Sequence, residues 1–354
     1  MTADTGPDTR SLKPVSVDIA VVGAGPAGLF AAYYAGLRGL RVALLDSLPH
    51  PGGQVAALYP EKRIHDIAGL PAVHGRELID NLLLQVAPFE PEWLLGHTAV
   101  SLNRSANGGG WVIGTDQGGD VRCGAVVVTG GVGSFTPRRL PAGDSYEGRG
   151  VTYHVARLAD HRGQDVVVVG GGDSAVDWAL ALEPLARSVT LVHRTDRFRA
   201  QAHSVDLLRR SSVEVVTGAQ VTACHGVERL SAVDVTVTGS EGSPERRDCQ
   251  AMIAALGFTA RLGPIGQWGM ALVGNRILVG TDMQTDVPGV FAAGDIATYP
   301  GRVPLIAVGF GEAATAVNNA VARVRPDLGA VPGHSSDAVM PPAPQPVPAL
   351  AAAS

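Results

Sequence analysis

Two stretches of this 354-residue chain share one hydrophobic pattern, in which a short apolar run stops at glycines and is followed by a longer apolar stretch. The first reads DIAVVGAGPAGLFAAYYAGLRG over residues 18–39, and the second reads QDVVVVGGGDSAVDWA over residues 164–179. A run of four or five apolar residues bounded by glycine is typical of a buried strand, and the longer stretch is typical of a helix. The chain therefore predicts two strand-turn-helix units.

The first turn, GAGPAG, predicts a dinucleotide site. Its glycines, Gly23, Gly25 and Gly28, let the backbone approach a pyrophosphate, whose charge is held by the N–H groups and dipole at the start of the following helix. Pro26 and Ala27 complete the turn. The next apolar run, VALLD, places Asp46 18 residues beyond Gly28, where a carboxylate binds a ribose hydroxyl.

The second turn predicts a second dinucleotide site with a different preference. Its following strand, TLVH, ends in arginine rather than in a carboxylate. A guanidinium makes paired, charge-assisted bonds to a 2′-phosphate, so we expect this site to bind NADPH. Two such sites in one chain indicate electron transfer between bound cofactors. The residues expected to contact NADPH are Gly170, Gly172, Asp173, Ser174, Ala175, His193, Arg194 and Arg199.

Each turn also has a structural explanation, because glycine turns join strands to helices in proteins without ligands, and arginines often form a solvated helix face. Residues 187–210 nevertheless contain six arginines and only two aspartates, in a chain whose net charge is −5. A local positive excess of this kind favours anion binding.

A chain of 354 residues is too long for one ordinary core, so its length predicts about two domains, and the 45% of residues that are hydrophobic are enough to form their cores. The uncharged stretch at 19–37 is interrupted by Pro26 and glycines, so we expect no membrane span. The first residues lack a basic start followed by an apolar segment, which favours a cytoplasmic location.

The pattern of strands and breaks predicts an α/β fold with two Rossmann-like domains, the second inserted in the first. Glycine, proline and arginine interrupt the pattern after the strand that precedes Gly133, and a strand ending near Gly257 returns the chain to the first domain. Pro/Ala-rich sequence at the end cannot form a core. The expected segments are a disordered lead (1–16), the first domain (17–133 and 258–336), the inserted domain (134–257) and a tail (337–354).

The three cysteines, Cys123, Cys224 and Cys249, lie far apart and form neither a CxxC nor a metal-binding spacing. We expect structural roles for all three and no metal site.

Taken together, the motifs resemble those of the two-domain flavoprotein reductases of the thioredoxin reductase type. GAGPAG, GGQ at 52–54, GGGDSA, HRTDRFRA at 193–200 and GVFAAGD at 289–295 occur in the order of that family, over residues 17–336. The resemblance implies that FAD is held by the first turn together with Gly294 and Asp295, and that the inserted domain holds NADPH.

One element of the thioredoxin reductase pattern is missing. The dithiol that passes electrons to a disulfide is replaced by a stretch containing Tyr153, His154 and Val155. Disulfide exchange requires a thiolate, so the usual disulfide reductase chemistry is excluded unless another cysteine pair assembles in space. The chain is most similar to the dithiol-free branch, the thioredoxin-reductase-like ferredoxin (flavodoxin) NADP reductases, through residues 52–71, 170–179, 305–320 and 334–336.

That resemblance implies a homodimer that takes a hydride from NADPH onto the flavin and passes single electrons to ferredoxin or flavodoxin. It also implies roles for individual residues. Tyr59 and His334 stack on the two faces of the isoalloxazine, Ser335 or Ser336 lies near its reactive edge, and Asp295 binds the ribityl chain. Gln54, which follows Gly53, reaches the isoalloxazine; a plain turn residue is the alternative.

Three departures from the branch are visible. Thr195 stands where a second arginine is common, Asp46 replaces a longer glutamate, and His65 replaces an aromatic residue. Two other functions stay open: a flavoenzyme that acts directly on a small metabolite, and a non-catalytic flavin-binding or redox-sensing module. Bleaching of the flavin by NADPH, and the acceptor that restores it, distinguish the three.

Overall fold

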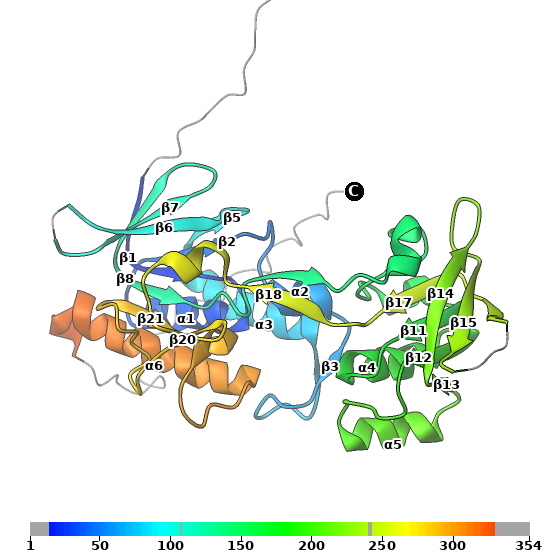
Figure 1. Cartoon of the computed structure of the whole chain (residues 1–354). Coiled ribbons are helices and arrows are strands. Elements are labelled where there is room, and N and C mark those ends of the chain that lie inside the picture. Colours follow the sequence, from blue (N-terminus) through cyan, green and yellow to red (C-terminus); the bar gives the residue numbers. More distant parts are fainter. Residues whose placement is uncertain (1–13, 107, 240–242, 330–354) are drawn as a thin grey trace, which may run out of the picture. The chain divides into compact units, whose positions relative to one another are not determined.

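The computed structural model describes residues 14–106, 108–239 and 243–329. Contacts divide the chain into two compact units, and Figure 1 labels their helices and strands. The described part of unit 1 is 14–56, 65–106, 108–134 and 261–329, and that of unit 2 is 57–64, 135–239 and 243–260. The first strand begins at Val15, so two residues expected in the lead are part of a strand instead. The tail expected at 337–354 lies outside the described residues.

Unit 1 is built on a seven-stranded sheet whose central strands are apolar and parallel. The register pairs Val22 with both Leu45 and Val128, which brings the carboxyl ends of three strands level at the first glycine turn. A small second sheet is formed by β19 (Leu272–Val273), β20 (Arg276–Leu278) and β22 (Ala297–Thr298). The strands of the large sheet are β1 (Val15–Val22), β2 (Val42–Asp46), β5 (Glu92–Leu95), β6 (Ala99–Arg104), β7 (Trp111–Thr115), β8 (Asp120–Val128) and β21 (Val290–Ala292).

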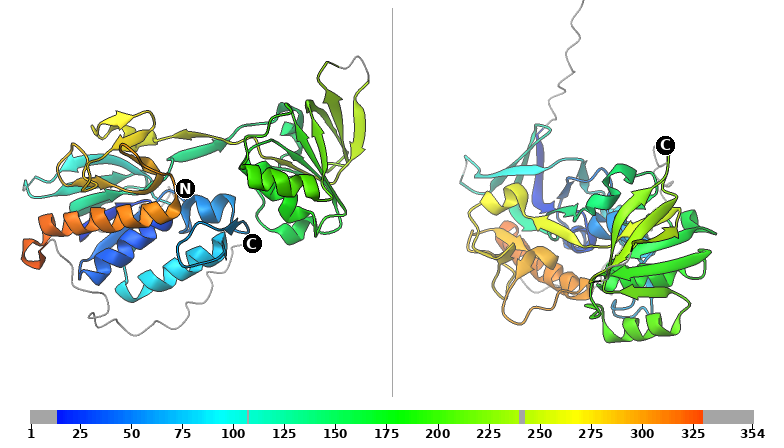
Figure 2. Two further views of the ribbon diagram at one scale, coloured as in Figure 1. Left: turned by 90° about the horizontal axis from the view of Figure 1, so that it is seen from below. Right: turned by 45° about the vertical axis from the view of Figure 1, so that its right-hand side comes forward.

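Three helices pack together in unit 1, with α1 lying between α3 and α6 (Figure 2). The close contact is possible because the buried positions of α1 are mostly glycine and alanine. The last helix begins at Ile306, where the apolar residues IAVGF start its pattern. The helices are α1 (Pro26–Leu37), α3 (Gly75–Val86) and α6 (Ile306–Val324), and the 3-10 turns are η1 (Ala87–Phe89), η4 (Gly263–Gln267), η5 (Gly294–Ile296) and η6 (Pro326–Leu328).

Unit 2 has a parallel sheet of five strands in the order β10-β17-β11-β12-β13, next to an antiparallel sheet of three. One core packs between the parallel sheet and its helices, and another packs toward the antiparallel sheet. The parallel strands are β10 (Val151–Thr152), β11 (Asp165–Val169), β12 (Ser188–His193), β13 (Glu214–Thr217) and β17 (Ala251–Ala254). The remaining elements are α4 (Asp173–Leu182), α5 (Ala202–Arg210), η2 (Pro141–Tyr146), η3 (Leu158–His161), β14 (Ala219–His225), β15 (Ala232–Val237) and β16 (Glu245–Asp248).

The chain passes between the units through a ribbon of two paired strands, β9 (Ser134–Pro137) and β18 (Phe258–Arg261). Phe135 and Phe258 stabilise this ribbon by an edge-to-face contact, with ring centroids 5.8 Å apart. The other elements are α2 (Gly53–Leu58), β3 (Arg63–Ile64) and β4 (Val73–His74).

The expected α/β class with two parallel, Rossmann-like sheets is confirmed. Among the helices that the structure describes, none combines the length and the apolar character needed to cross a bilayer.

Candidate functional site

The first glycine turn leaves β1 in a conformation that only glycine adopts easily. Gly23 has φ +115°, and a Cβ there would lie 2.5 Å from the Thr129 carbonyl oxygen. A Cβ at Gly28 would lie 1.8 Å from the Gly23 carbonyl oxygen, so α1 packs directly against the end of the strand. Thr129 closes this contact by donating its hydroxyl to that carbonyl, at 2.8 Å. Both glycines are therefore required by the fold.

Gly25 differs, because its surroundings are open. A Cβ at Gly25 would find no heavy atom closer than the Gly53 Cα, 3.8 Å away. Gly25 is also the N-cap of α1, whose first turn has no side-chain cap and no acidic residue. Uncapped N–H groups beside an open glycine match the needs of a pyrophosphate, so this turn fits a dinucleotide.

Asp46 ends β2 next to the turn, and its carboxylate is already bonded to the backbone. Oδ2 accepts from the Ala24 N–H at 2.7 Å, and Oδ1 accepts from the Leu48 N–H at 2.9 Å. Burial raises the pKa of this carboxyl, and the two backbone bonds oppose that rise. Asp46 therefore orients the glycine turn, a role that the sequence did not reveal, and its contact with a ribose stays a prediction.

The GGQ segment packs against the same turn. The Gly52 N–H donates to the Ala24 carbonyl at 2.8 Å. A Cβ at Gly53, where φ is +53°, would lie 2.9 Å from the Gly25 Cα. Gln54 extends its side chain toward the end of β8, where its Nε2 lies 2.8 Å from the position that a Cβ of Gly131 would take. The predicted neighbours of the flavin thus gather around one turn.

Gly294 and Asp295 join this group from the other end of the sequence. A Cβ at Gly294 would lie 3.1 Å from the Ala27 Cβ, in the first turn of α1. The Asp295 side chain is 47% exposed, and its Oδ1 lies 3.4 Å from Arg302 Nη2. Unit 1 therefore brings together the first glycine turn, Asp46, Gln54, Gly294 and Asp295.

The second glycine turn repeats the division between crowded and open glycines. Gly170 has φ +149°, and its Cβ would lie 2.5 Å from the Ala255 carbonyl oxygen. A Cβ at Gly172, the N-cap of α4, would meet nothing within 4 Å. Ala175 is fully buried in the place of the third glycine. The open face at the start of α4 again fits a pyrophosphate.

The first residues of α4 have different environments. The Asp173 carboxylate accepts from the Gln201 N–H at 2.8 Å, which ties α4 to the start of α5. Ser174 is exposed on the first turn.

The buried ring of His193 packs against the second turn at Gly171. The side chain is 6% exposed, and a Cβ at Gly171 would lie 2.2 Å from its ring. Its Nε2 lies 3.1 Å from the Thr195 hydroxyl and 3.2 Å from the Arg197 carbonyl, and its ring lies against Phe198 with centroids 5.1 Å apart. His193 and Thr195 therefore shape the loop after β12.

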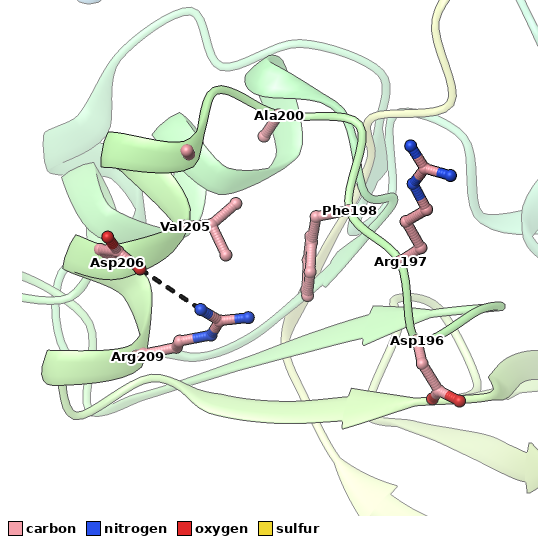
Figure 3. A pocket seen from close by; sticks show the side chains of 8 residues that line it. Asp196, Arg197, Phe198, Ala200, Val205, Asp206 and Arg209 are labelled. Carbon is pink, nitrogen blue, oxygen red and sulfur yellow. Dashed lines mark hydrogen bonds and ion pairs between the residues drawn. The ribbon is translucent and has the colours of Figure 1, made fainter.

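Arg194 and Arg199 are exposed on this loop, as a 2′-phosphate site requires. The Arg199 N–H donates to the Gly171 carbonyl at 2.8 Å, which fixes this arginine next to the second turn. A pocket of about 440 Å³ lies between the loop and α5. In Figure 3 the Phe198 ring faces Val205 and Arg209 across it, and Arg209 is paired with Asp206. Gly172, Arg194 and Arg199 do not line this pocket, so it is distinct from the surface predicted to bind NADPH.

Tyr59 lies in unit 2, although its sequence neighbours at 52–54 lie in unit 1. Its half-buried ring packs against the core around α4. Lys62, three residues on, pairs with Asp177 of α4 at 2.5 Å. His65 is exposed, and its Nδ1 lies 3.4 Å from the Pro71 carbonyl. His334, Ser335 and Ser336 lie outside the described residues.

The three cysteines are free, and no two of them form a disulfide. Cys123 and Cys249 are buried, and Cys224 is half-buried. Burial raises the thiol pKa of Cys123 and Cys249 to about 12 and that of Cys224 to about 11. Cys224 and Cys249 are close enough to interact electrostatically, but both stay protonated at neutral pH and are poor nucleophiles.

In the stretch that replaces the dithiol, Tyr153 and Val155 are buried, and burial lowers the pKa of His154. No cluster of three or more metal-ligating side chains occurs in the part of the chain that the structure describes.

Comparison with known proteins gives the class. A family model described as pyridine nucleotide-disulphide oxidoreductase matches residues 17–320, so the chain belongs to that family. Membership implies binding of FAD and a pyridine nucleotide.

Curated relatives specify the branch, the thioredoxin-reductase-like ferredoxin–NADP reductases. The ferredoxin–NADP reductase of Salinispora arenicola is 55% identical over 321 residues, covering 91% of this chain and 98% of the relative. That of Thermus thermophilus is 46% identical over 332 residues, covering 92% and 98%. In fold, the chain is similar to T. acidophilum thioredoxin reductase, with a TM-score of 0.74, 24% identity and coverage of 89% and 99%.

Proposed function

We propose that this chain is a ferredoxin–NADP reductase that uses FAD and NADPH. The observation that carries the proposal is the 55% identity to a ferredoxin–NADP reductase across 91% of the chain. Two complete glycine turns and the absence of a paired dithiol among the three cysteines support it, because the reaction needs two nucleotide sites and no sulfur relay.

In unit 1 we assign each residue a task in holding FAD. The start of α1 binds the pyrophosphate next to the open face of Gly25, and Asp46 accepts a hydroxyl of the adenosine ribose. Asp295 accepts from the ribityl chain, and Gln54 reaches the isoalloxazine from α2. Bound FAD supplies the redox chemistry, since it accepts a hydride and releases electrons singly.

In unit 2 the start of α4 and Gly172 bind the pyrophosphate of NADPH. Arg194 and Arg199 bind its 2′-phosphate, which is the basis of the preference for NADPH over NADH. His193 and Thr195 act indirectly by holding the loop that carries both arginines. Tyr59 and His334 are assigned to the two faces of the isoalloxazine and Ser335 to its edge, following the resemblance of their motifs.

The acceptor, the assembly and the location complete the proposal. We assign ferredoxin as the electron acceptor, with flavodoxin as the other carrier, a homodimer as the working assembly and the cytoplasm as the location. These follow the branch to which the motifs belong.

The test is a turnover assay on the purified yellow holoenzyme. NADPH should bleach the flavin absorbance anaerobically, and ferredoxin with cytochrome c should then sustain rapid turnover. Bleaching without carrier turnover, but with consumption of a small acceptor, would indicate a metabolite flavoenzyme. Absence of bleaching would indicate a binding or sensing module.

A further inference from the structure

A buried ion pair lies directly behind the Gly294–Asp295 turn. The Arg302 side chain is 3% exposed and that of Glu312, on α6, is 2% exposed. Arg302 Nε donates to Glu312 Oε1 at 2.8 Å, and Nη2 donates to Oε2 at 3.3 Å. Two opposite charges are thus removed from water beside the segment that we assign to the ribityl chain.

Glu312 uses both oxygens to hold this segment. Its Oε2 accepts from the Gly294 N–H at 2.7 Å, and its Oε1 accepts from the Tyr299 hydroxyl at 2.9 Å. Burial and the bond to Glu312 raise the pKa of Tyr299, so its hydroxyl stays a donor. The carboxylate therefore joins three positions of the 294–302 loop to α6.

Arg302 continues the connection to Asp295. Its Nη2 lies between Glu312 and Asp295, 3.4 Å from Asp295 Oδ1. The Asp295 side chain stays 47% exposed, so the aspartate is restrained on one oxygen while the carboxylate remains accessible. A lysine has a single nitrogen and could not bridge the two carboxylates with the geometry of this fork.

This arrangement is energetically unfavourable, which indicates that it has a function. Arg302 Nη1 is buried and makes no hydrogen bond to any described residue. A buried donor without a partner is unfavourable, and a buried ion pair adds little net stability compared with apolar packing. The pair instead specifies the geometry of the turn.

We propose that Arg302 and Glu312 are positioning residues for FAD, which hold the Gly294–Asp295 turn so that Asp295 accepts a ribityl hydroxyl. The proposal rests on the assignment of FAD to unit 1. Gly294 supports this link, because it packs against Ala27 in the first turn of α1 and against Gly309 of α6.

The experiment titrates FAD into the deflavinated full-length chain and measures the dissociation constant from the change in flavin fluorescence. Arg302→Lys keeps the charge and should weaken FAD binding about tenfold, the effect of one charge-assisted hydrogen bond. Arg302→Met should weaken it further; if this variant fails to fold because Glu312 is left unpaired, Arg302→Lys still decides.

A double-mutant cycle distinguishes positioning from a general loss of structure. If Arg302 acts through Asp295, Arg302→Lys should have no further effect on the FAD dissociation constant in an Asp295→Asn background. Additive losses in the double variant, or unchanged FAD affinity in Arg302→Lys, would overturn the proposal.

The matched control is Arg325→Lys, which alters an exposed pair with Asp327 just beyond α6 and should leave FAD affinity unchanged. Failure of the native chain to bind FAD would instead refute the proposed function, so the two failures are distinguishable.

Discussion

The two glycine turns have a similar backbone conformation and similar crowding at their first glycine, and they differ at the third position of the motif. Gly23 and Gly170 both have positive φ and both face a carbonyl oxygen 2.5 Å from the position of a Cβ. At the third position, a Cβ on Gly28 would lie 1.8 Å from backbone, whereas unit 2 accommodates the methyl group of Ala175. The separation of helix and strand therefore decides which residue the motif needs there.

The turns also differ in charge at the end of the following strand. In unit 1 the Asp46 carboxylate bonds to the backbone of its own turn, at Ala24. In unit 2 the buried ring of His193 supports the turn, and the charges belong to the exposed Arg194 and Arg199. The same strand-turn-helix scaffold thus carries a carboxylate in unit 1, which we assign to a ribose, and guanidinium groups in unit 2, which we assign to a 2′-phosphate.

The largest expected effect comes from exchanging the third positions. Gly28→Ala forces a methyl group into backbone, so we expect loss of the yellow holoenzyme and destabilisation of unit 1 by about 3 kcal/mol or more. Ala175→Gly should cost only about 1 kcal/mol, the helix-propensity difference. Denaturant unfolding and flavin content measure both. A Gly28→Ala protein with native colour and stability would show that the helix and strand are not in contact.

Reversing a charge on the second turn should come next. Arg199→Glu removes a phosphate contact and adds repulsion, so kcat/KM for NADPH should fall about 100-fold while that for NADH is spared. Arg210→Glu, an exposed charge at the end of α5, is the control for long-range electrostatics. Equal losses for both coenzymes would contradict the assignment of Arg199 to the 2′-phosphate.

A methyl group on the open glycine should produce a smaller and purely ligand-dependent effect. Gly172→Ala has room in the free chain, so Tm should be unchanged while KM for NADPH rises about tenfold. Gly171→Ala collides with the His193 ring and should lower Tm instead. Thermal scans and steady-state kinetics separate the two. An unchanged KM in Gly172→Ala would place the pyrophosphate elsewhere.

The smallest expected effect is the pH-dependent contribution of Asp46 to the free energy of unfolding. Because its pKa is raised in the folded protein, its contribution to stability is present below the usual aspartate range and is lost as pH rises through the folded pKa. Asp46→Asn lacks this dependence. The free energy of unfolding of the native chain relative to the variant, measured on deflavinated protein, should therefore decrease from pH 4 to pH 7. An increase over this range would reverse the sign of the shift.

The fold was predictable because its signals are local. Apolar runs ending in glycine mark parallel strands, and the order of five short motifs identified the class, which the structure and the relatives confirm. The absence of a CxxC was also visible in the sequence, and with it the branch.

The details of the site depend on distant contacts and were less accessible. Nothing in the sequence shows that Tyr59 packs with unit 2, that His193 supports Gly171, or that Arg302 and Glu312 meet. Such pairs are brought together by packing rather than by spacing along the chain. The ligand contacts of Gly172, Arg199, Asp295 and Tyr59 stay predictions, and His334 and Ser335 lie outside the described residues.

The most direct test of electron transfer without a sulfur relay is ferredoxin reduction by a chain whose three cysteines are replaced by alanine. NADPH-dependent reduction of ferredoxin, followed through cytochrome c, should proceed at the native rate per bound FAD. Loss of carrier reduction in a variant whose flavin is still bleached by NADPH would contradict the account, because it would assign the second transfer step to a thiol.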